Sequence, residues 1–308
     1  MPDRARSALA ALAVEAALGY PQKVRHPVEA AGWAISALER RWNRPERSEA
    51  DRRRLGVAAL VLIGGGAALV GLLTSRAVRR TPGDGLALET LLATTGLAQK
   101  SLYDHVDAVR RALDRGDLAA ARIAVGRIVG RDTAALDEAG VAAAALESLA
   151  ESFNDGIVAP AAWLAVGGLP GLFAYKAVNT ADSLIGHREP RWRSFGWAAA
   201  RTDDLMNLAP ARLAGALLCL AGGGGWRVMA RDADKHASPN AGWPEAAMAG
   251  ALGIRLGGPA TYDGAVVERP VFGDGPPATP ADLRRGLDLY VRACGLLWLL
   301  IGSFAWRR

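Results

Sequence analysis

Cysteine is nearly missing from this chain of 308 residues, which contains two, Cys219 and Cys294. Both lie inside apolar segments. A disulfide framework needs several paired cysteines, and a zinc site built on thiolates needs them at close spacing. The sequence therefore argues against a disulfide-stabilised fold and against a cysteine-ligated metal site.

Several familiar enzyme signatures are missing too. The sequence contains no phosphate-binding loop of the G-x-x-x-x-G-K-[ST] type, no nucleophile elbow and no histidine-based zinc signature. It shows little β-strand pattern and no internal repeat. The net charge is +6, but basic residues are not interleaved with aromatics in any motif, so we expect no nucleic-acid partner.

Apolar residues are abundant instead. Hydrophobic residues make up 51% of the chain and charged residues 22%, and the mean hydropathy is positive. Such a mixture indicates apolar spans that alternate with polar loops. We therefore expect an all-α, polytopic integral membrane protein with about five membrane-embedded helices, bound to the lipid bilayer.

The clearest membrane span runs from Leu55 to Leu73 and contains no charged residue. At a rise of about 1.5 Å per residue it nearly crosses a hydrocarbon core of about 30 Å. The basic section before it, Tyr20 to Arg54, is expected in the cytoplasm by the positive-inside rule. The other candidate spans are Leu205 to Gly222 and Leu287 to Trp306, and, with weaker patterns, Ala5 to Leu18, Leu86 to Ala98 and Ile157 to Tyr175.

We treat residues 1–308 as a single membrane-embedded domain with polar excursions at approximately 100–155, 176–204 and 223–285. The first excursion contains a turn at Asp114–Asp117, with Asp117 as the N-cap of the next helix. The third is rich in glycine and proline and contains one helix, which opens at Pro244-Glu245. The apolar N-terminal run carries Glu15 and is read as a retained helix.

The segment Ile157–Tyr175 separates two of these polar excursions, and both carry side chains suited to chemistry. A straight crossing would put the two excursions on opposite faces of the membrane. Pro160, Gly167, Gly168, Pro170 and Gly171 allow the segment to break. We therefore expect a broken or re-entrant helix that lines a cavity, where irregular backbone is tolerated at membrane depth.

Three carboxylates dominate the most informative stretch. Glu147, Glu151 and Asp155 fall at positions i, i+4 and i+8 of a helix, so they share one face. Their repulsion costs roughly 0.2–0.5 kcal/mol per pair in water and more at a membrane edge. A cation should offset it: a Mg²⁺ ion, a charged substrate, or an arginine that forms a structural ion pair, such as Arg131, Arg201 or Arg212.

Two further groups lie beside apolar segments. Lys176, Asn179 and Asp182 recur at helical spacing on one face. Asp203, Asp204 and Asn207 open an otherwise apolar span, where ionisable groups are functional by default. Aspartate pairs commonly hold Mg²⁺ together with substrate phosphates. The alternative is a solvated helix N-terminus whose acids are favoured by the helix dipole.

Two loops add donors and acceptors. Gly130-Arg131-Asp132-Thr133 is either a capping turn, with Asp132 or Thr133 as the cap, or a phosphate site built on Arg131. His236, Ser238 and Asn240 lie in a second dense polar stretch. A histidine alone is more often structural, but in this company we take His236 as a functional candidate.

The order of the motifs is more specific than any one of them, and over roughly residues 15–300 it resembles the CobD/CbiB family, the adenosylcobinamide-phosphate synthases of cobalamin biosynthesis. One departure is Gly19-Tyr20-Pro21, where the family usually has Gly-Asp-Pro. The seven matching motifs are His26-Pro-Val; Gly130-Arg-Asp-Thr; Glu147 and Glu151 with Asp155-Gly-Ile and Ala-Pro; Tyr175-Lys-Ala-Val-Asn-Thr with Asp-Ser; Ala200-Arg with Asp-Asp, Asn and Pro-Ala-Arg; Ser238-Pro-Asn with Glu-Ala; and Ala249-Gly-Ala-Leu-Gly with Gly-Gly-Pro, followed by Gly273-Asp274.

The resemblance implies a multi-pass enzyme of the bacterial inner membrane whose active site faces the cytoplasm. It implies an ATP-dependent amide ligation that joins adenosylcobyric acid, a corrinoid, to aminopropanol phosphate or threonine phosphate. ATP and Mg²⁺ are the expected cofactors, and the corrinoid and a small phosphorylated amino alcohol are the expected partners. The oligomeric state is left open by the sequence.

Roles are assigned by residue type. The expected metal ligands are Glu147, Glu151, Asp155, Asp203 and Asp204. Expected catalytic residues are Glu147, Glu151, Asp155, Lys176 and His236. The residues expected to bind substrate are Arg131, Asn154, Asn179, Asp182, Arg201, Asn207, Arg212, Ser238 and Asn240.

Two other classes of function stay open at this point. A Mg²⁺-dependent membrane phosphotransferase that acts on a lipid alcohol would also place Asp and Asn residues at helix ends, without a need for ATP. A membrane transporter of a corrinoid or phosphorylated solute would bury charges near mid-membrane and form no covalent product.

Overall fold

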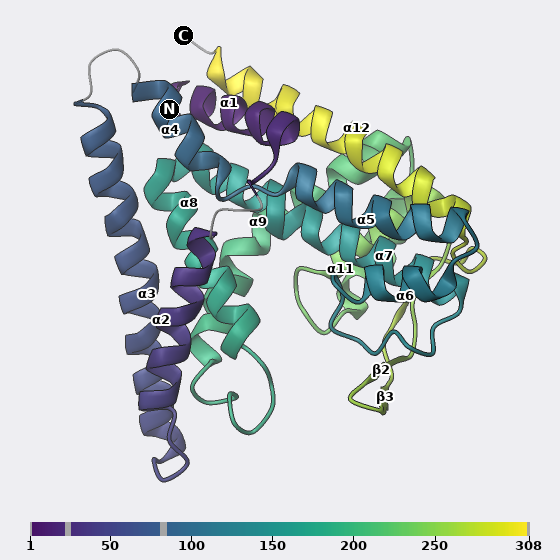
Figure 1. Ribbon diagram of the computed structural model, residues 1–308, viewed down its shortest axis with the longest axis horizontal. Helices are drawn as coiled ribbons and strands as arrows, with labels where there is room; N and C mark the ends of the chain where they lie inside the picture. The colour runs from purple at the N-terminus through teal and green to yellow at the C-terminus, as the bar shows by residue number, and fades with distance from the viewer. Residues whose placement is uncertain (1, 22–25, 81–84, 307–308) are drawn as a thin grey trace. The chain divides into compact units, whose positions relative to one another are not determined.

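The computed structural model describes residues 2–21, 26–80 and 85–306 of the chain, and helices dominate this part (Figure 1). The helices are α1 (Pro2–Leu18), α2 (Pro27–Trp42), α3 (Glu49–Val78), α4 (Gly85–Thr94), α5 (Gln99–Asp114), α6 (Leu118–Val125), α7 (Glu138–Phe153), the π-helical turn η1 (Asn154–Val158), α8 (Ala159–Ile185), α9 (Trp197–Gly222), α10 (Trp226–Asp232), the 3₁₀ turn η2 (Ala233–Lys235), α11 (Gly242–Leu252) and α12 (Pro280–Ala305). The all-α prediction is confirmed.

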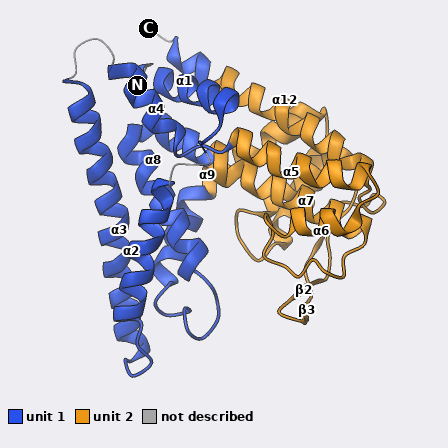
Figure 2. Cartoon of the chain, viewed as in Figure 1, with its two compact units in different colours: residues 1–98, 159–207, 301–308 blue, residues 99–158, 208–300 orange. Residues whose placement is uncertain are grey.

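The chain forms two compact units (Figure 2). Unit 1 contains residues 1–98, 159–207 and 301–308, and unit 2 contains residues 99–158 and 208–300. Two of the boundaries fall inside α9 and α12, and another falls between η1 and α8.

Four helical stretches of the described residues are long and apolar enough to cross a membrane. Only 17% of the most apolar stretch of Glu49–Val78 is buried inside the protein, so hydrocarbon must cover the rest of its apolar side chains. The protein is thus a polytopic membrane protein, and the count of four is close to the expected five. The stretches are Glu49–Val78, the continuous Glu138–Ile185, Trp197–Gly222 and Pro280–Ala305.

Two of the three weaker candidate spans, Ala5–Leu18 and Leu86–Ala98, fall in short helices. Helix α1 has 17 residues and α4 has 10, whereas a membrane crossing needs about 20. The two helices pack against each other in unit 1. Helix α1 buries Ala8, Ala11 and Leu12, whereas Leu86 and Leu91 of α4 are exposed.

Helix α8 is the centre of unit 1, because α1, α2, α3 and α4 all pack against it. The approach of α3 to α8 requires Gly71, since a Cβ there would lie 2.7 Å from the backbone oxygen of Leu169. At this level α8 also breaks: Gly168 has φ 64° and ψ −157°, and Pro170 follows. The expected break in the segment Ile157–Tyr175 is thus found at Gly168.

Unit 2 packs α5 against α6 and α7, and α7 against α11. Asp117 caps α6 as predicted, because its carboxylate accepts a hydrogen bond of 2.9 Å from the Ala120 N–H. The cap of α7 is Asp137, whose carboxylate accepts a hydrogen bond from the Gly140 N–H. The prediction that Asp132 or Thr133 caps this helix is therefore wrong: both precede the cap by several residues.

The excursion at 223–285 is more structured than the sequence indicated. Helix α10 precedes α11, and two antiparallel strand pairs follow. Strand β1 (Leu256–Gly257) pairs with β4 (Val271–Phe272), and β2 (Ala260–Tyr262) pairs with β3 (Ala265–Val267). Strands of two or three residues are too short to leave an alternating pattern, so they were not evident in the sequence.

Candidate functional site

Glu147 is enclosed by positive partners in unit 2. Its carboxylate pairs with the guanidiniums of Arg131 and Arg269, the latter at 3.0 Å, and accepts a hydrogen bond of 2.8 Å from the Gly257 N–H. The Glu147 side chain is 2% exposed. Gly257 suits this close approach because its φ is 82°. The ion-pair alternative raised by the sequence thus describes the surroundings of Glu147.

Arg269 is a residue that the sequence did not single out. It lies between β3 and β4, and its side chain is 14% exposed. Its Nη1 atom donates no hydrogen bond to a described residue. Burial works to lower the pKa of Arg269, but the nearby carboxylates of Glu147 and Glu245 raise it more, so the guanidinium stays charged.

Glu245 is the most unusual carboxylate of unit 2. It lies in the first turn of α11 with no solvent exposure. Neither of its oxygens accepts a hydrogen bond from a described residue. Its nearest nitrogen atoms from basic side chains are His236 Nε2, 3.6 Å away, and Arg269 Nη2, 3.8 Å away. Burial, followed by the negative charge of Glu151, raises the pKa of Glu245 well above the usual range.

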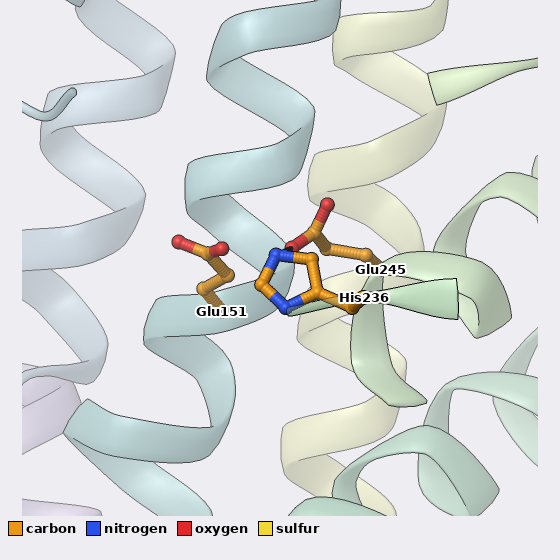
Figure 3. A group of neighbouring side chains, drawn as sticks. All are labelled: Glu151, His236 and Glu245. Carbon is orange, nitrogen blue, oxygen red and sulfur yellow. Dashed lines mark ion pairs between the residues drawn. The ribbon is translucent and has the colours of Figure 1, made fainter. Parts of the chain in front are cut away.

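Glu151, His236 and Glu245 form one cluster (Figure 3). One nitrogen or oxygen atom from each lies within 4.8 Å of the others. Glu151 comes from α7, Glu245 from α11, and His236 from the residue after η2. The helical packing of α7 on α11 therefore brings together acids that are far apart in sequence.

His236 is held by its own backbone turn. The Ser238 N–H donates a hydrogen bond of 2.9 Å to His236 Nδ1, so Nδ1 carries a lone pair. Ser238 Oγ in turn accepts hydrogen bonds from the N–H groups of Asn240, at 3.2 Å, and Ala241, at 3.3 Å. Burial lowers the pKa of His236. The ring is consequently neutral at pH 7, with its hydrogen on Nε2.

Asn154 and Asp155 lie in the π-helical turn that follows α7. The Asn154 side-chain amide donates a hydrogen bond of 2.7 Å to the Asp155 carboxylate. A π turn contains an extra residue, so it shifts Asp155 from the position that regular helical spacing assigns to it. Asp155 thus has a different surrounding from Glu147 and Glu151.

Arg212 and Asn240 contact each other at the other side of α11. Arg212 Nη1 donates hydrogen bonds to Asn240 Oδ1, at 3.2 Å, and to the Leu208 carbonyl, at 2.8 Å. The guanidinium lies over the Trp243 ring, 4.6 Å from its centre. Three such contacts fix the Arg212 side chain in unit 2.

Unit 1 contains a continuous polar chain between α8 and α9. The Tyr175 hydroxyl donates to Asn207 Oδ1 at 3.1 Å, and Asn207 Nδ2 donates to Asp203 Oδ2 at 3.0 Å. Asn179 Nδ2 donates to the other Asp203 oxygen at 3.2 Å. Three candidate residues are thus brought together, Asn179 from one predicted group and Asp203 and Asn207 from the other. Asp204 lies outside this chain, 3.7 Å from Arg201.

Lys176 and the His26 motif meet at a cavity of about 450 Å³ in unit 1. Lys176 and Phe173 of α8, Pro27 and Val28 of α2, and apolar residues of α3 line it. A helix that lines a cavity was expected from this part of the sequence. His26 itself caps α2: its Nδ1 accepts a hydrogen bond of 3.2 Å from the Val28 N–H. Asp182 lies further along α8 and is half-buried.

The sequence-predicted residues thus form two sets. Glu147, Glu151, Asp155, His236, Arg131, Asn154, Arg212, Ser238 and Asn240 belong to unit 2. Lys176, Asn179, Asp182, Arg201, Asp203, Asp204 and Asn207 belong to unit 1.

The sequence missed Glu245 and Arg269. Glu245 was read as an acid that favours a helix start, which it also is. Its signal is that it opens a helix of otherwise apolar residues, Trp243 to Leu252. Arg269 gives no such signal, because it stands in a short irregular connection.

Comparison with known proteins identifies the family. The family model described as CobD/Cbib protein matches residues 8–290. Cobalamin biosynthesis protein CobD of Rhodobacter capsulatus is 49% identical over 304 residues, which cover 96% of this chain and 95% of that protein. The proteins of the same name from Sinorhizobium sp and Rhizobium meliloti are 46% and 44% identical over 303 and 311 residues, covering 93% and 96% of this chain and 94% and 95% of theirs.

No solved structure matches the chain. The motif order, the match to nearly the whole chain and the polytopic helical fold agree, and they confirm the resemblance seen in the sequence. The chain belongs to the CobD/Cbib family of cobalamin biosynthesis proteins.

Proposed function

We propose that this protein joins adenosylcobyric acid to aminopropanol phosphate, or to threonine phosphate, in an ATP-dependent amide ligation. A carboxylate is a poor electrophile, so the reaction needs ATP to activate it as an acyl phosphate or an adenylate. The amine then attacks the activated carbonyl and forms the amide, and the leaving group is phosphate from an acyl phosphate or AMP from an adenylate. The site must therefore bind phosphate charge and stabilise charge that develops at the carbonyl.

One observation supports this proposal most. In unit 2 the buried guanidiniums of Arg131 and Arg269 meet at Glu147, next to the cluster of Glu151, His236 and Glu245. Groups that bind anions and groups that bind cations are thus neighbours, as a metal–phosphate complex requires. Arg269 Nη1, which donates to no described residue, is a donor suited to a phosphate or carbonyl oxygen.

In this proposal the residues of unit 2 have different roles in the reaction. Glu147 holds the two guanidiniums in place, and Arg131 and Arg269 bind phosphate oxygens. Glu151 takes part in binding Mg²⁺, which would neutralise the phosphates of ATP. Mg²⁺ prefers oxygen ligands and is usually held by one or two carboxylates with substrate phosphates, so the carboxylates of this cluster fit it.

The polar groups of unit 1 are proposed to bind substrate. Lys176 presents its ammonium to the cavity of about 450 Å³, where a phosphate is the complementary partner. Asn179, Asp182 and Asn207 offer hydrogen bonds of the type that the amide-rich rim of a corrin needs.

We also propose the inner membrane as the location, with the polar sections on the cytoplasmic side. The four apolar helices support a membrane location. The basic residues Arg52, Arg53 and Arg54, in the first turns of α3 and directly before its apolar run, support the orientation.

The test is a ligation assay with purified protein in detergent. The protein is incubated with adenosylcobyrate, ATP, Mg²⁺ and either aminopropanol phosphate or threonine phosphate, and the corrinoid is analysed by mass spectrometry. We expect a product with the mass of the corrinoid plus the amine less one water, and one ATP consumed per amide. Product formation at full rate without nucleotide, or ATP consumption without a new corrinoid, would contradict the proposal.

A further inference from the structure

Charge balance in unit 2 points to a missing positive partner. Glu147, Glu151 and Glu245 contribute three carboxylates, and Arg131 and Arg269 contribute two guanidiniums. Both guanidiniums contact Glu147, and only Arg269 also approaches Glu245, at 3.8 Å. The Glu245 carboxylate accepts no hydrogen bond from a described residue, in a place where desolvation makes an uncompensated negative charge costly.

The Glu245 carboxylate shows where the partner belongs. It is fully buried, and neither oxygen accepts a hydrogen bond from a described residue. Buried polar atoms in folded proteins nearly always have a partner. Its nearest acid is Glu151, and Figure 3 shows their carboxylates with the His236 ring between them in this view. Two carboxylates that face one space need a shared proton or a shared cation.

His236 is the third member of the cluster, but its geometry excludes it as a ligand through Nε2. The Ser238 N–H donates to Nδ1, so the hydrogen of the neutral ring is on Nε2, the atom that faces Glu245 Oε1 at 3.6 Å. A metal at Nε2 would need the hydrogen on Nδ1, where it would collide with the Ser238 N–H. An imidazole N–H that points at a ligating carboxylate is instead a common way to orient the ligand.

We propose that Glu245 and Glu151 together ligate a divalent cation through oxygen, and that His236 is a positioning residue that orients Glu245. A site with two carboxylates and no nitrogen suits Mg²⁺, or Mn²⁺ as its substitute, and leaves positions for water and phosphate oxygens. With the ion bound, the local charge becomes positive, which favours phosphate. The biological role of this ion rests on the proposed ligation, but the site itself can be tested without substrates.

The experiment is a Mn²⁺ titration of the purified full-length protein, with free Mn²⁺ measured by electron paramagnetic resonance. We expect the wild type to bind one Mn²⁺ per chain at this site, in competition with Mg²⁺. Glu245→Gln and Glu151→Gln should each weaken binding more than about 100-fold, beyond the roughly 10–100-fold that an outer-shell partner costs. The matched control is Glu138→Gln, because Glu138 is an exposed carboxylate on the same helix as Glu151.

The positioning role of His236 is tested by separate measurements. His236→Gln should weaken Mn²⁺ binding by roughly 10–100-fold. Pulsed resonance of Mn²⁺ bound to the wild type should show no coupling to a directly bound nitrogen, and a strong nitrogen coupling would overturn the positioning role. Each variant is checked by thermal unfolding without metal. Glu245→Gln should unfold at a temperature close to that of the wild type there, because glutamine has nearly the same shape as glutamate and places no charge in this buried position.

Two results would overturn the site. Glu245→Gln with unchanged Mn²⁺ affinity is the first. Absence of Mn²⁺ binding by a folded wild type is the second, and it would show that a shared proton or a water fills the role. Ligation in the presence of that second result would leave the proposed function standing, whereas tight Mn²⁺ binding without any ligation would remove the function and keep the site.

Discussion

The polar chain of unit 1 and the cluster of unit 2 are both built from buried acids, but they differ in how those acids are satisfied. In unit 1, each oxygen of the Asp203 carboxylate accepts a hydrogen bond from an asparagine, and the chain ends at a tyrosine hydroxyl. In unit 2, both oxygens of Glu245 accept none from described residues. The comparison separates an acid whose hydrogen-bond partners are in place from an acid that we propose to be completed by a cation.

The largest loss of stability is expected for a substitution of Glu147, because this residue is paired with both Arg131 and Arg269. Glu147→Gln removes the charge that faces Arg131 and Arg269, so two nearly buried guanidiniums lose their counterion. Breaking a buried pair in this way should lower the free energy of unfolding by about 3–5 kcal/mol. Thermal and denaturant unfolding in detergent measures it, with Glu138→Gln, expected within about 0.5 kcal/mol of wild type, as the control. A stable Glu147→Gln protein that has lost Mn²⁺ binding would place Glu147 among the metal ligands.

A smaller loss of stability is expected when the chain of hydrogen bonds in unit 1 is interrupted. Asn207→Leu removes the acceptor of the Tyr175 hydroxyl and a donor to Asp203, and it leaves both groups buried. Removing one partner from a buried hydrogen bond costs about 1–3 kcal/mol, so we expect a loss of about 2–3 kcal/mol. Added Mg²⁺ should not restore this loss. A Mg²⁺-dependent rescue would mean that unit 1 also contains a cation site and would break the comparison.

Asp232 sharpens the comparison, because it is a fully buried acid of unit 2 with every partner in place. It accepts hydrogen bonds from Arg231 at 2.6 and 2.7 Å and from the Gly273 N–H at 2.8 Å, and it pairs with Lys235 at 2.7 Å. The Arg231 hydrogen bonds, against the effect of burial, hold the pKa of Asp232 far below its usual range. Asp232→Asn should cost about 2 kcal/mol at pH 7.

The direction of the pKa shift of Asp232 determines how this loss of stability depends on pH. A carboxylate whose pKa is lower in the folded than in the unfolded protein adds stability above the unfolded value of about 4, and loses it as the pH falls below that value. The difference in unfolding free energy between the wild type and Asp232→Asn should therefore be constant from pH 7 to about pH 5 and shrink below pH 4. Unfolding curves at several pH values measure it, and a difference that grows on acidification would contradict the assignment.

The smallest loss of stability is expected at Tyr175, where the chain of hydrogen bonds in unit 1 ends. Tyr175→Phe removes one hydroxyl that donates to Asn207 and leaves the fully buried ring in place. One hydrogen bond contributes about 1 kcal/mol, so the thermal midpoint should fall by a few degrees at most. A loss above about 3 kcal/mol would show that the polar chain acts as a cooperative unit.

The helices could be predicted from the sequence because their signals are local. The uncharged run Leu55–Leu73 lies within α3, and the turn at Asp117 caps α6 as expected. The break at Gly168 followed from the cluster of Gly and Pro around it. The short strands were missed because their pairing joins residues such as Leu256 and Phe272 across an irregular loop.

The site could be predicted only in part, because residues that are far apart in the sequence come together in it. Helical spacing put Glu147 and Glu151 on one face, but the two acids have different surroundings because different partners reach them from elsewhere in the chain. Arg269 and Glu245 arrive by tertiary packing, and no period in the sequence connects them with α7. The helical spacing indicated which face of the helix carries the acids. The tertiary fold determines which of these acids is paired with cationic side chains.

The central claim is that the acids of unit 2, and not those of unit 1, form the cation site. The most direct measurement is the shift of the melting temperature with Mg²⁺ in the wild type, Asp203→Asn and Glu245→Gln, because a ligand stabilises only the state that binds it. We predict equal upward shifts in the wild type and Asp203→Asn and none in Glu245→Gln. A shift that persists in Glu245→Gln and disappears in Asp203→Asn would contradict the account.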